Sequence, residues 1–177
     1  MKLLRSLFCL TGMSIALVAS ADTAFESAFR ASLLKSYDDA TGKILQLAEA
    51  IPADNYGWRP MEGVNSVQEA LVHVTEANLG LGGMLGGTPP AGLDRKTVGA
   101  SMKTKAEAIA VTKQGITFIH DLLATMPVEG LTAEMNFFGG KATKVRVAMI
   151  AADHAHEHLG QLIAYARSNH VTPPWSK

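Results

Sequence analysis

Two histidines near the C-terminus, His154 and His158, stand four positions apart in a strongly helical run. Residues four apart lie on one face of an α-helix, so both imidazoles point to the same side. A neutral imidazole offers one lone pair, and adjacent imidazoles can chelate a first-row transition metal ion. Because two ligands do not hold an ion alone, the pair predicts a metal site only if another part of the chain supplies a third ligand.

Both histidines could instead be core residues with ordinary hydrogen-bond partners, and a lone histidine such as His73 is more often of that kind. Two neutral imidazoles side by side in an apolar stripe are different, because their ring nitrogens lack partners. Each buried polar group left unpaired costs ~1–3 kcal/mol, and a bound ion would remove that cost. The pair is therefore better evidence for a metal than His73 alone.

The segment from His154 to His158 also fits H-x-x-E-H, the signature of inverted zinc peptidases, with Glu157 as general base. We expect such a peptidase to take its third ligand from a glutamate well downstream. No aspartate or glutamate follows His158. The sequence therefore argues against a peptidase.

The other histidines are weaker candidates for metal ligands. His156 lies about 200° around the helix from either member of the pair. His120 could be a fourth ligand, although a core or surface role is favoured, and His170 follows the last helix, where it suits the negative end of the helix dipole. Three glutamates could orient a histidine or move a proton, but no catalytic base is assigned: Glu69, Glu76 and Glu157.

Four amphipathic helices are expected to position these side chains, since apolar residues recur at steps of three and four over 23–51, 66–81, 104–126 and 143–168. Capping boxes should open the second and third helices, and prolines should end the first and third. The residues concerned are Ser66 with Glu69, Thr104 with Glu107, Pro52 and Pro127. Four helices with little strand signal predict an all-α fold, a four-helix bundle.

Specific positions within these helices carry further expectations. Phe25 in the first helix and Ala106 in the third should face inward, and Gly42 should weaken or bend the first helix. In the last helix, both His154 and His158 should lie on the core side.

Two connections leave alternatives open. The segment 82–100 is rich in glycine and contains Pro89-Pro90, so it should lack regular structure and serve either as a crossover between helices or as a lid over a site. The segment 135–143 could form a small hairpin or cap one end of the bundle. In the loop before Ser66, Tyr56 and Trp58 should pin the backbone to the core.

The first 21 of the 177 residues read as a secretory signal peptide, with Lys2 and Arg5 ahead of a short apolar run and small residues at 19–21. Cleavage before Asp22 would leave 156 residues, 22–177, as a single exported domain without stable membrane insertion. The formal net charge would change from zero to −2, which implies no nucleic-acid partner. Cys9, the only cysteine, would also be lost, so the domain has no disulfide or thiol nucleophile.

Three groups of residues resemble the DinB-like (DinB/YfiT) family: Trp58-Arg59-Pro60, the run from Ser66 to His73, and His154-x-x-Glu157-His158-x-Gly160-Gln161-Leu162-x-x-Tyr165-x-Arg167-x-Asn169 with Pro173-Pro174. The resemblance implies a four-helix bundle with a long crossover between its second and third helices. It also implies a divalent metal, zinc or nickel, on three histidines. Carried over by position, these are His73, His154 and His158.

Such a site, three histidines and an open position, could activate water or a small substrate, as in a hydrolase or transferase. Members of the family include cytosolic S-transferases and isomerases that use low-molecular-weight thiols, and predicted export argues against a thiol cofactor here. Alternatives are a non-enzymatic or stress-related protein with a structural metal and a helical binding module without one. Family analogy also suggests a homodimer.

Overall fold

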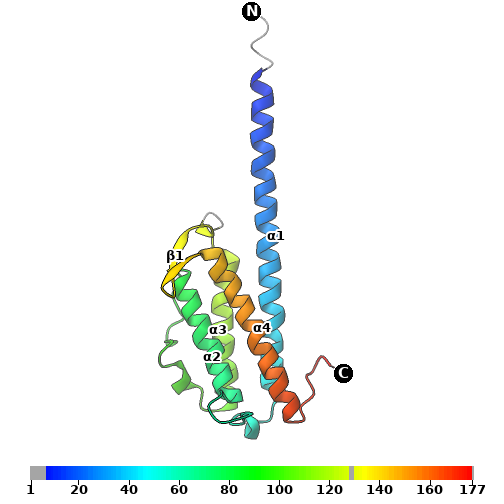
Figure 1. The fold of residues 1–177 in the computed structure, drawn as a ribbon, viewed down its shortest axis with the longest axis vertical. Helices are drawn as coiled ribbons and strands as arrows, with labels where there is room; N and C mark the ends of the chain where they lie inside the picture. Colours follow the sequence, from blue (N-terminus) through cyan, green and yellow to red (C-terminus); the bar gives the residue numbers. More distant parts are fainter. Residues whose placement is uncertain (1–6, 128–129, 177) are drawn as a thin grey trace, which may run out of the picture.

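The computed structural model describes residues 7–127 and 130–176, with side chains from residue 24 onward. Four long helices carry the fold, as expected for an all-α four-helix bundle (Figure 1). In chain order the elements are α1 (Leu7–Ala50), the short 3₁₀ helix η1 (Ala53–Asn55), α2 (Val67–Met84), the 3₁₀ helix η2 (Val98–Ser101), α3 (Lys105–Thr125), β1 (Glu134–Phe137), β2 (Gly140–Thr143) and α4 (Lys144–Ser168).

Helix α1 begins well before the expected position at residue 23 and extends beyond the other three helices (Figure 1). The segment before residue 23 is rich in leucine and alanine, which favour a helix. The expectation that Phe25 faces inward is wrong: its side chain is 73% exposed. Gly42 does not interrupt the helix.

The predicted signal peptide begins in residues outside the described part of the chain, so its cleavage stays a prediction. Within the described part, no helix combines the length and the apolar character needed to cross a membrane.

Both capping boxes form as predicted. The Ser66 side chain accepts from Glu69 N at 3.2 Å, and the Glu69 carboxylate accepts from Ser66 N at 2.7 Å. Thr104 and Glu107 do the same at the start of α3. Such caps contribute about 0.5–2 kcal/mol each. By fixing where α2 begins, the first box also fixes the direction in which His73 points, two turns later.

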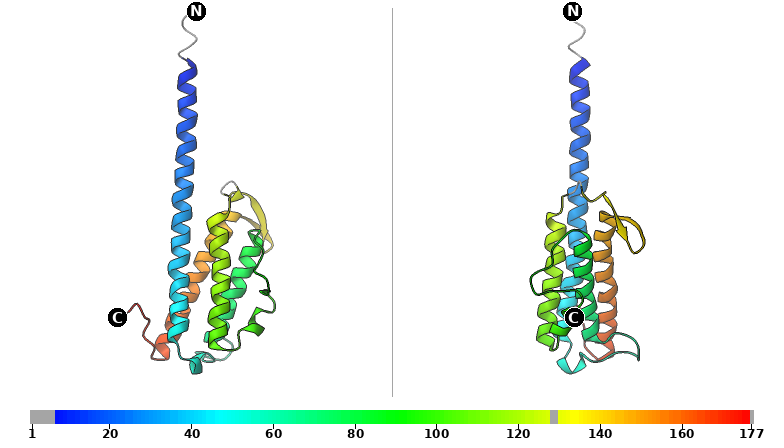
Figure 2. Two further views of the ribbon diagram at one scale, coloured as in Figure 1. Left: turned by 180° about the vertical axis from the view of Figure 1, so that it is seen from behind. Right: turned by 90° about the vertical axis from the view of Figure 1, so that its left-hand side faces the viewer.

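The connection between α2 and α3 follows the length of the bundle. Both helices begin at the end that carries the loop between α1 and α2, and both run towards the end that carries the hairpin (Figure 2). It is more ordered than expected: α2 continues to Met84, and η2 buries Val98. Gly82 lies within α2, and its missing side chain leaves room for Phe118 of α3, whose Cε1 is 2.2 Å from where a Cβ would lie. The crossover expected from the sequence is therefore present.

The segment 135–143 forms a hairpin. β1 pairs antiparallel with β2, from Glu134 opposite Thr143 to Phe137 opposite Gly140. The two turn residues, Phe138 and Gly139, both have positive φ, 44° and 82°. Two such residues give the type I′ turn that matches the twist of a hairpin.

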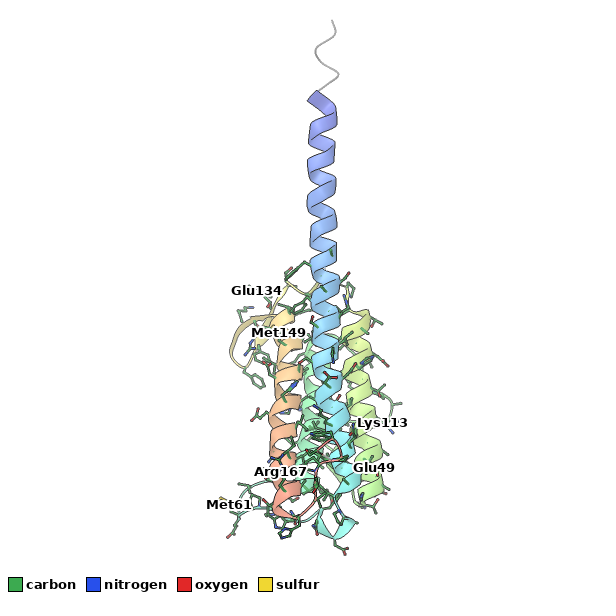
Figure 3. All side chains as sticks on the ribbon, turned by 90° about the vertical axis from the view of Figure 1, so that its right-hand side faces the viewer. Glu49, Met61, Lys113, Glu134, Met149 and Arg167 are labelled. Atoms are coloured by element: carbon green, nitrogen blue, oxygen red, sulfur yellow. The ribbon has the colours of Figure 1, made fainter. Side chains whose placement is uncertain are left out.

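The core lies between the four helices and is built mainly from aliphatic side chains (Figure 3). Fully buried examples come from every helix: Ile44, Leu71, Ile119 and Leu162. Ala106 is exposed rather than inward, because the buried face of α3 begins at Ala108 and continues through Thr112 and Ile116. Tyr56 pins its loop as predicted, since it is buried and donates to Ala48 O at 2.6 Å.

Candidate metal centre

The structure brings His73, His154 and His158 together between α2 and α4. His154 Nε2 lies 3.1 Å from His73 Nε2 and 3.1 Å from His158 Nε2. One ligand atom from each ring lies within 4.8 Å of the others. The three residues expected as metal ligands therefore point one nitrogen each at a common place, and the group could hold a metal ion.

The donor set fits a metal ion better than it fits hydrogen bonds alone. A tetrahedral ion with metal–nitrogen bonds of about 2.0–2.1 Å holds its nitrogens about 3.3 Å apart, close to the spacing observed here. His154 Nε2 carries at most one hydrogen and contacts two other ring nitrogens. One hydrogen cannot serve both contacts fully, whereas an ion would accept a lone pair from each ring.

A chain of hydrogen bonds fixes the ring of His158. Its Nδ1 donates to Gln161 Oε1 at 2.7 Å, Gln161 Nε2 donates to Tyr165 OH at 2.9 Å, and that hydroxyl donates to Asn65 O at 2.9 Å. Trp58 packs edge-on against Tyr165, with ring centroids 5.3 Å apart. Because an amide oxygen only accepts, the hydrogen of the neutral ring lies on Nδ1 and leaves the Nε2 lone pair directed at the cluster.

The three rings differ in exposure: His73 is exposed, His154 is half-buried and His158 is buried. Burial lowers the pKa of His154 from 6.5 to about 4, and repulsion from His158 and His73 adds to this. The pKa of His73 is also lowered, first because neighbouring atoms remove part of its ring from water and then by His158. Both rings are therefore neutral at pH 7, which is the form that binds metal.

A cavity of about 190 Å³ lies beside His73 and His154. Its walls come from α2, α4, the crossover and the hairpin tip, with these other lining residues: Glu76, Ala77, Gly80, Leu81, Met84, Arg95, Phe138 and Ile150. A larger cavity of about 670 Å³ lies along α3 and the start of the crossover, and none of the three histidines lines it. The smaller cavity is the one that the candidate metal centre faces.

The remaining histidines lie outside the cluster. His120 is not a fourth ligand, because its Nδ1 pairs with Asp38 Oδ1 of α1 at 2.8 Å. His156 Nδ1 donates to Ala152 O at 2.9 Å within its own helix. His170 follows α4 with a φ of 58°. The sequence had already argued against His156 and His170 as metal ligands, and the structure agrees.

The three candidate glutamates are placed differently. Glu69 is engaged in the cap of α2 and pairs with Arg59 at 3.0 Å. Glu157 is exposed and does not line the cavity, and Gln161 bonds to His158 and Tyr165 rather than to Glu157. Glu76 does line the cavity. No carboxylate belongs to the metal-binding group found among the described residues, so the peptidase arrangement is absent there.

Sequence reasoning missed the roles of Gln161, Arg95 and Phe138. Gln161 stands three residues after His158, a spacing at which helical side chains meet, so its role could have been predicted. Arg95 and Phe138 reach the cavity from connections, whose paths the helical periodicity does not specify.

Comparisons with known proteins agree on one fold. A model of the DinB superfamily matches residues 36–162. A DinB-like protein from Bacillus subtilis, known from its crystal structure, is 21% identical with a TM-score of 0.60; a second, from Bacillus cereus, is 16% identical with a TM-score of 0.62. Each comparison covers 80% of this chain and 93% of the other. No curated protein matches.

Proposed function

The chain belongs to the DinB superfamily, and from this premise we propose that it is a metal-dependent enzyme that acts on a small molecule. His73, His154 and His158 would hold a divalent transition metal ion, zinc or nickel. The observation that carries the proposal is the convergence of three Nε2 atoms beside a cavity of about 190 Å³. A site with three protein ligands and an adjacent cavity is the arrangement of catalytic rather than structural metal sites.

When bound, such an ion supplies Lewis acidity, lowering the pKa of water towards ~7 or polarising a substrate oxygen, as a hydrolase or transferase requires. The chain's own residues prepare for this. Gln161 keeps the lone pair of His158 Nε2 directed at the ion, and the low pKa of His154 keeps that ring unprotonated. Glu76 is the carboxylate among the cavity residues, so it is the candidate to accept a proton from a bound substrate.

Metal analysis of the purified full-length chain tests the proposal. We expect a stoichiometric transition metal ion, lost together with its stabilising effect in a His73→Ala, His154→Ala double variant. The matched control is His120→Ala, His156→Ala, which removes two histidines outside the cluster and should retain the metal. The proposal would be refuted if the wild-type protein contained no stoichiometric metal and the double variant melted at the same temperature as wild type.

A structural ion that only ties α2 to α4 is the competing interpretation, because the three histidines come from those two helices. Cobalt(II) substitution separates the two. An open coordination position predicts that added azide changes the visible spectrum of the cobalt protein, whereas a closed site predicts no change.

We also propose that the protein is exported, on the basis of the N-terminal sequence. Expression in a Gram-negative host should yield periplasmic protein that begins at Asp22, as measured by N-terminal sequencing. Replacing both Ala19 and Ala21 with phenylalanine should block cleavage. Recovery of the uncleaved wild-type chain from the cytoplasm would refute export.

A further inference from the structure

The cavity beside the histidines contains one positively charged side chain, Arg95 of the crossover. Its guanidinium lies on α2 at Gly80, with Cζ and Nε each 3.2 Å from the position that a Cβ of Gly80 would occupy. A side chain at position 80 would therefore crowd the guanidinium. The glycine lets the charged group lie close to the helix, at the edge of the cavity.

The crossover around Arg95 is anchored at several points. Asp94 forms a turn, in which its side chain accepts from Lys96 N at 2.7 Å and its carbonyl accepts from Val98 N at 2.8 Å. Val98 is buried, and the Gln68 side chain of α2 donates to Met102 O. Arg95 is thus held against the bundle by its neighbours, although its own side chain is exposed.

Among the described side chains, none forms an ion pair with Arg95. The ion pairs formed by residues 24–127 and 130–176 do not include it, and Glu76 of the same cavity does not pair with it. A guanidinium presents a planar fork of donors that matches a carboxylate. The free donors of Arg95 therefore suit an anionic group of a ligand.

The rest of the cavity specifies the other parts of that ligand. Leu81, Met84, Ile150 and Phe138 make apolar walls. His73 and Gly80 are seven residues apart on α2, or about 10 Å along its axis. Glu76 lies between them, so the middle of the ligand should carry no negative charge. The volume is below the ~300–1,000 Å³ of pockets for drug-sized ligands, so the ligand is small.

We propose that this cavity binds a small carboxylate with an uncharged, apolar middle, whose carboxylate is recognised by Arg95 while its other end reaches His73 and His154. This inference rests on the proposed function for the role of the histidines, and it adds the substrate class. Arg95 acts as a specificity-determining residue.

The test uses hexanoate and hexanamide, which differ in charge but little in shape, with the metal-free full-length chain. Amide chemical shifts in ¹H–¹⁵N spectra report the binding of each. We expect hexanoate to shift the Gly80 and Arg95 amides with a dissociation constant in the millimolar range, and hexanamide to bind at least tenfold more weakly. In Arg95→Gln the two ligands should bind equally weakly. The control, Lys96→Gln, removes a neighbouring charge outside the cavity and should leave the preference intact.

Equal binding of both ligands to the wild-type chain, or an unchanged preference in Arg95→Gln, would overturn the inference. The inference would also be overturned if Lys96→Gln lost the preference for hexanoate as fully as Arg95→Gln, because the preference would then depend on the overall charge of the crossover. This readout needs no metal, so a chain that fails to bind metal but prefers hexanoate through Arg95 would refute the proposed function and leave the carboxylate site standing.

Discussion

Neighbouring groups set the tautomer of one ring in the histidine cluster and the protonation state of another. Gln161 accepts a hydrogen bond from Nδ1 of His158, whereas burial keeps His154 neutral, with a pKa of about 4. Such outer partners of metal ligands typically change metal affinity by 10–100-fold. Gln161 should therefore affect the affinity for the metal ion although it is not itself a ligand.

Gln161→Leu is expected to weaken metal binding by about 10–100-fold, because His158 loses the acceptor that holds its hydrogen on Nδ1. Gln161→Glu keeps an acceptor at the same place and should retain most of the affinity. Gln114→Leu, the same change on the exposed face of α3, is the control. Competition with a chelator of known affinity measures all three. Equal affinities for wild type and Gln161→Leu would contradict a role for this hydrogen bond.

Phe138 is an unusual residue for its backbone conformation. A bulky side chain at a φ of 44° costs of order 1–3 kcal/mol, and type I′ turns favour asparagine at this position. The ring is 79% exposed yet lines the cavity, so the fold does not gain much from burying it. The strain is consistent with a role in binding rather than in folding.

Phe138→Asn should therefore raise the free energy of unfolding by about 0.5–1 kcal/mol and weaken hexanoate binding. Urea unfolding and the amide shifts measure the two effects. Phe138→Leu is the matched variant, since it keeps both an apolar wall and the backbone strain. If Phe138→Asn binds hexanoate as tightly as wild type, the ring is not part of the binding wall.

The types and spacing of residues predicted which histidines meet, because His154 and His158 share a helix face whatever the tertiary structure. His73 came only from the family resemblance, since no local rule relates positions 73 and 154. Arg95 and Phe138 could not be predicted at all. Their approach to the cavity depends on the path of a long connection and on the twist of a hairpin.

At the scale of the elements, the start of α2 controls where His73 points, and its capping box depends on a charged carboxylate. A hydrogen bond from Ser66 N and the charge of Arg59 lower the pKa of Glu69 below its ordinary value of 4.5. The folded chain therefore releases this proton more readily than the unfolded chain. The resulting stability is present above pH 4.5 and is lost as the pH falls through the lower, folded value.

Glu69→Gln should therefore lower the melting temperature at pH 7, and its difference from wild type should shrink as the pH falls below 4.5 and wild-type Glu69 takes up its proton. Melting curves between pH 3 and pH 7 measure this difference. Glu62→Gln makes the same change at an exposed loop residue outside the cap and should alter the curve little. Parallel pH curves for wild type and Glu69→Gln would show that the cap does not use the charge.

Helix caps and apolar periodicity predicted the starts of α2, α3 and α4 to within one residue, because these signals are local. The start of α1 and the inward position of Phe25 were predicted wrongly. Periodicity identifies an apolar face but not whether another helix lies beside it. The hairpin was left open because its turn uses Phe138 where the familiar signal is asparagine.

At the scale of the whole molecule, the crossover determines which helices can share a site. Because it returns the chain along the full length of the bundle, α2 and α3 run parallel and α2 is left antiparallel to α4 (Figure 2). The cavity then extends from the histidines towards the end of the bundle that carries the hairpin. One connection thus supplies a wall of the cavity and sets the direction of α3 beside the helix that contributes His73.

A metal ion held by His73 of α2 and by two residues of α4 would link helices that are far apart in sequence, so its binding energy should appear as stability of the entire fold. An ion present at 100 times its dissociation constant adds about 2.7 kcal/mol. For a chain of this length, that corresponds to a rise in melting temperature of roughly 5–11 °C. The rise should grow with metal concentration and disappear with a chelator. Added metal should leave the melting temperature of His154→Ala unchanged, whereas it should raise the melting temperature of His156→Ala as much as that of wild type. An equal rise in His154→Ala would place the stabilising ion elsewhere on the molecule.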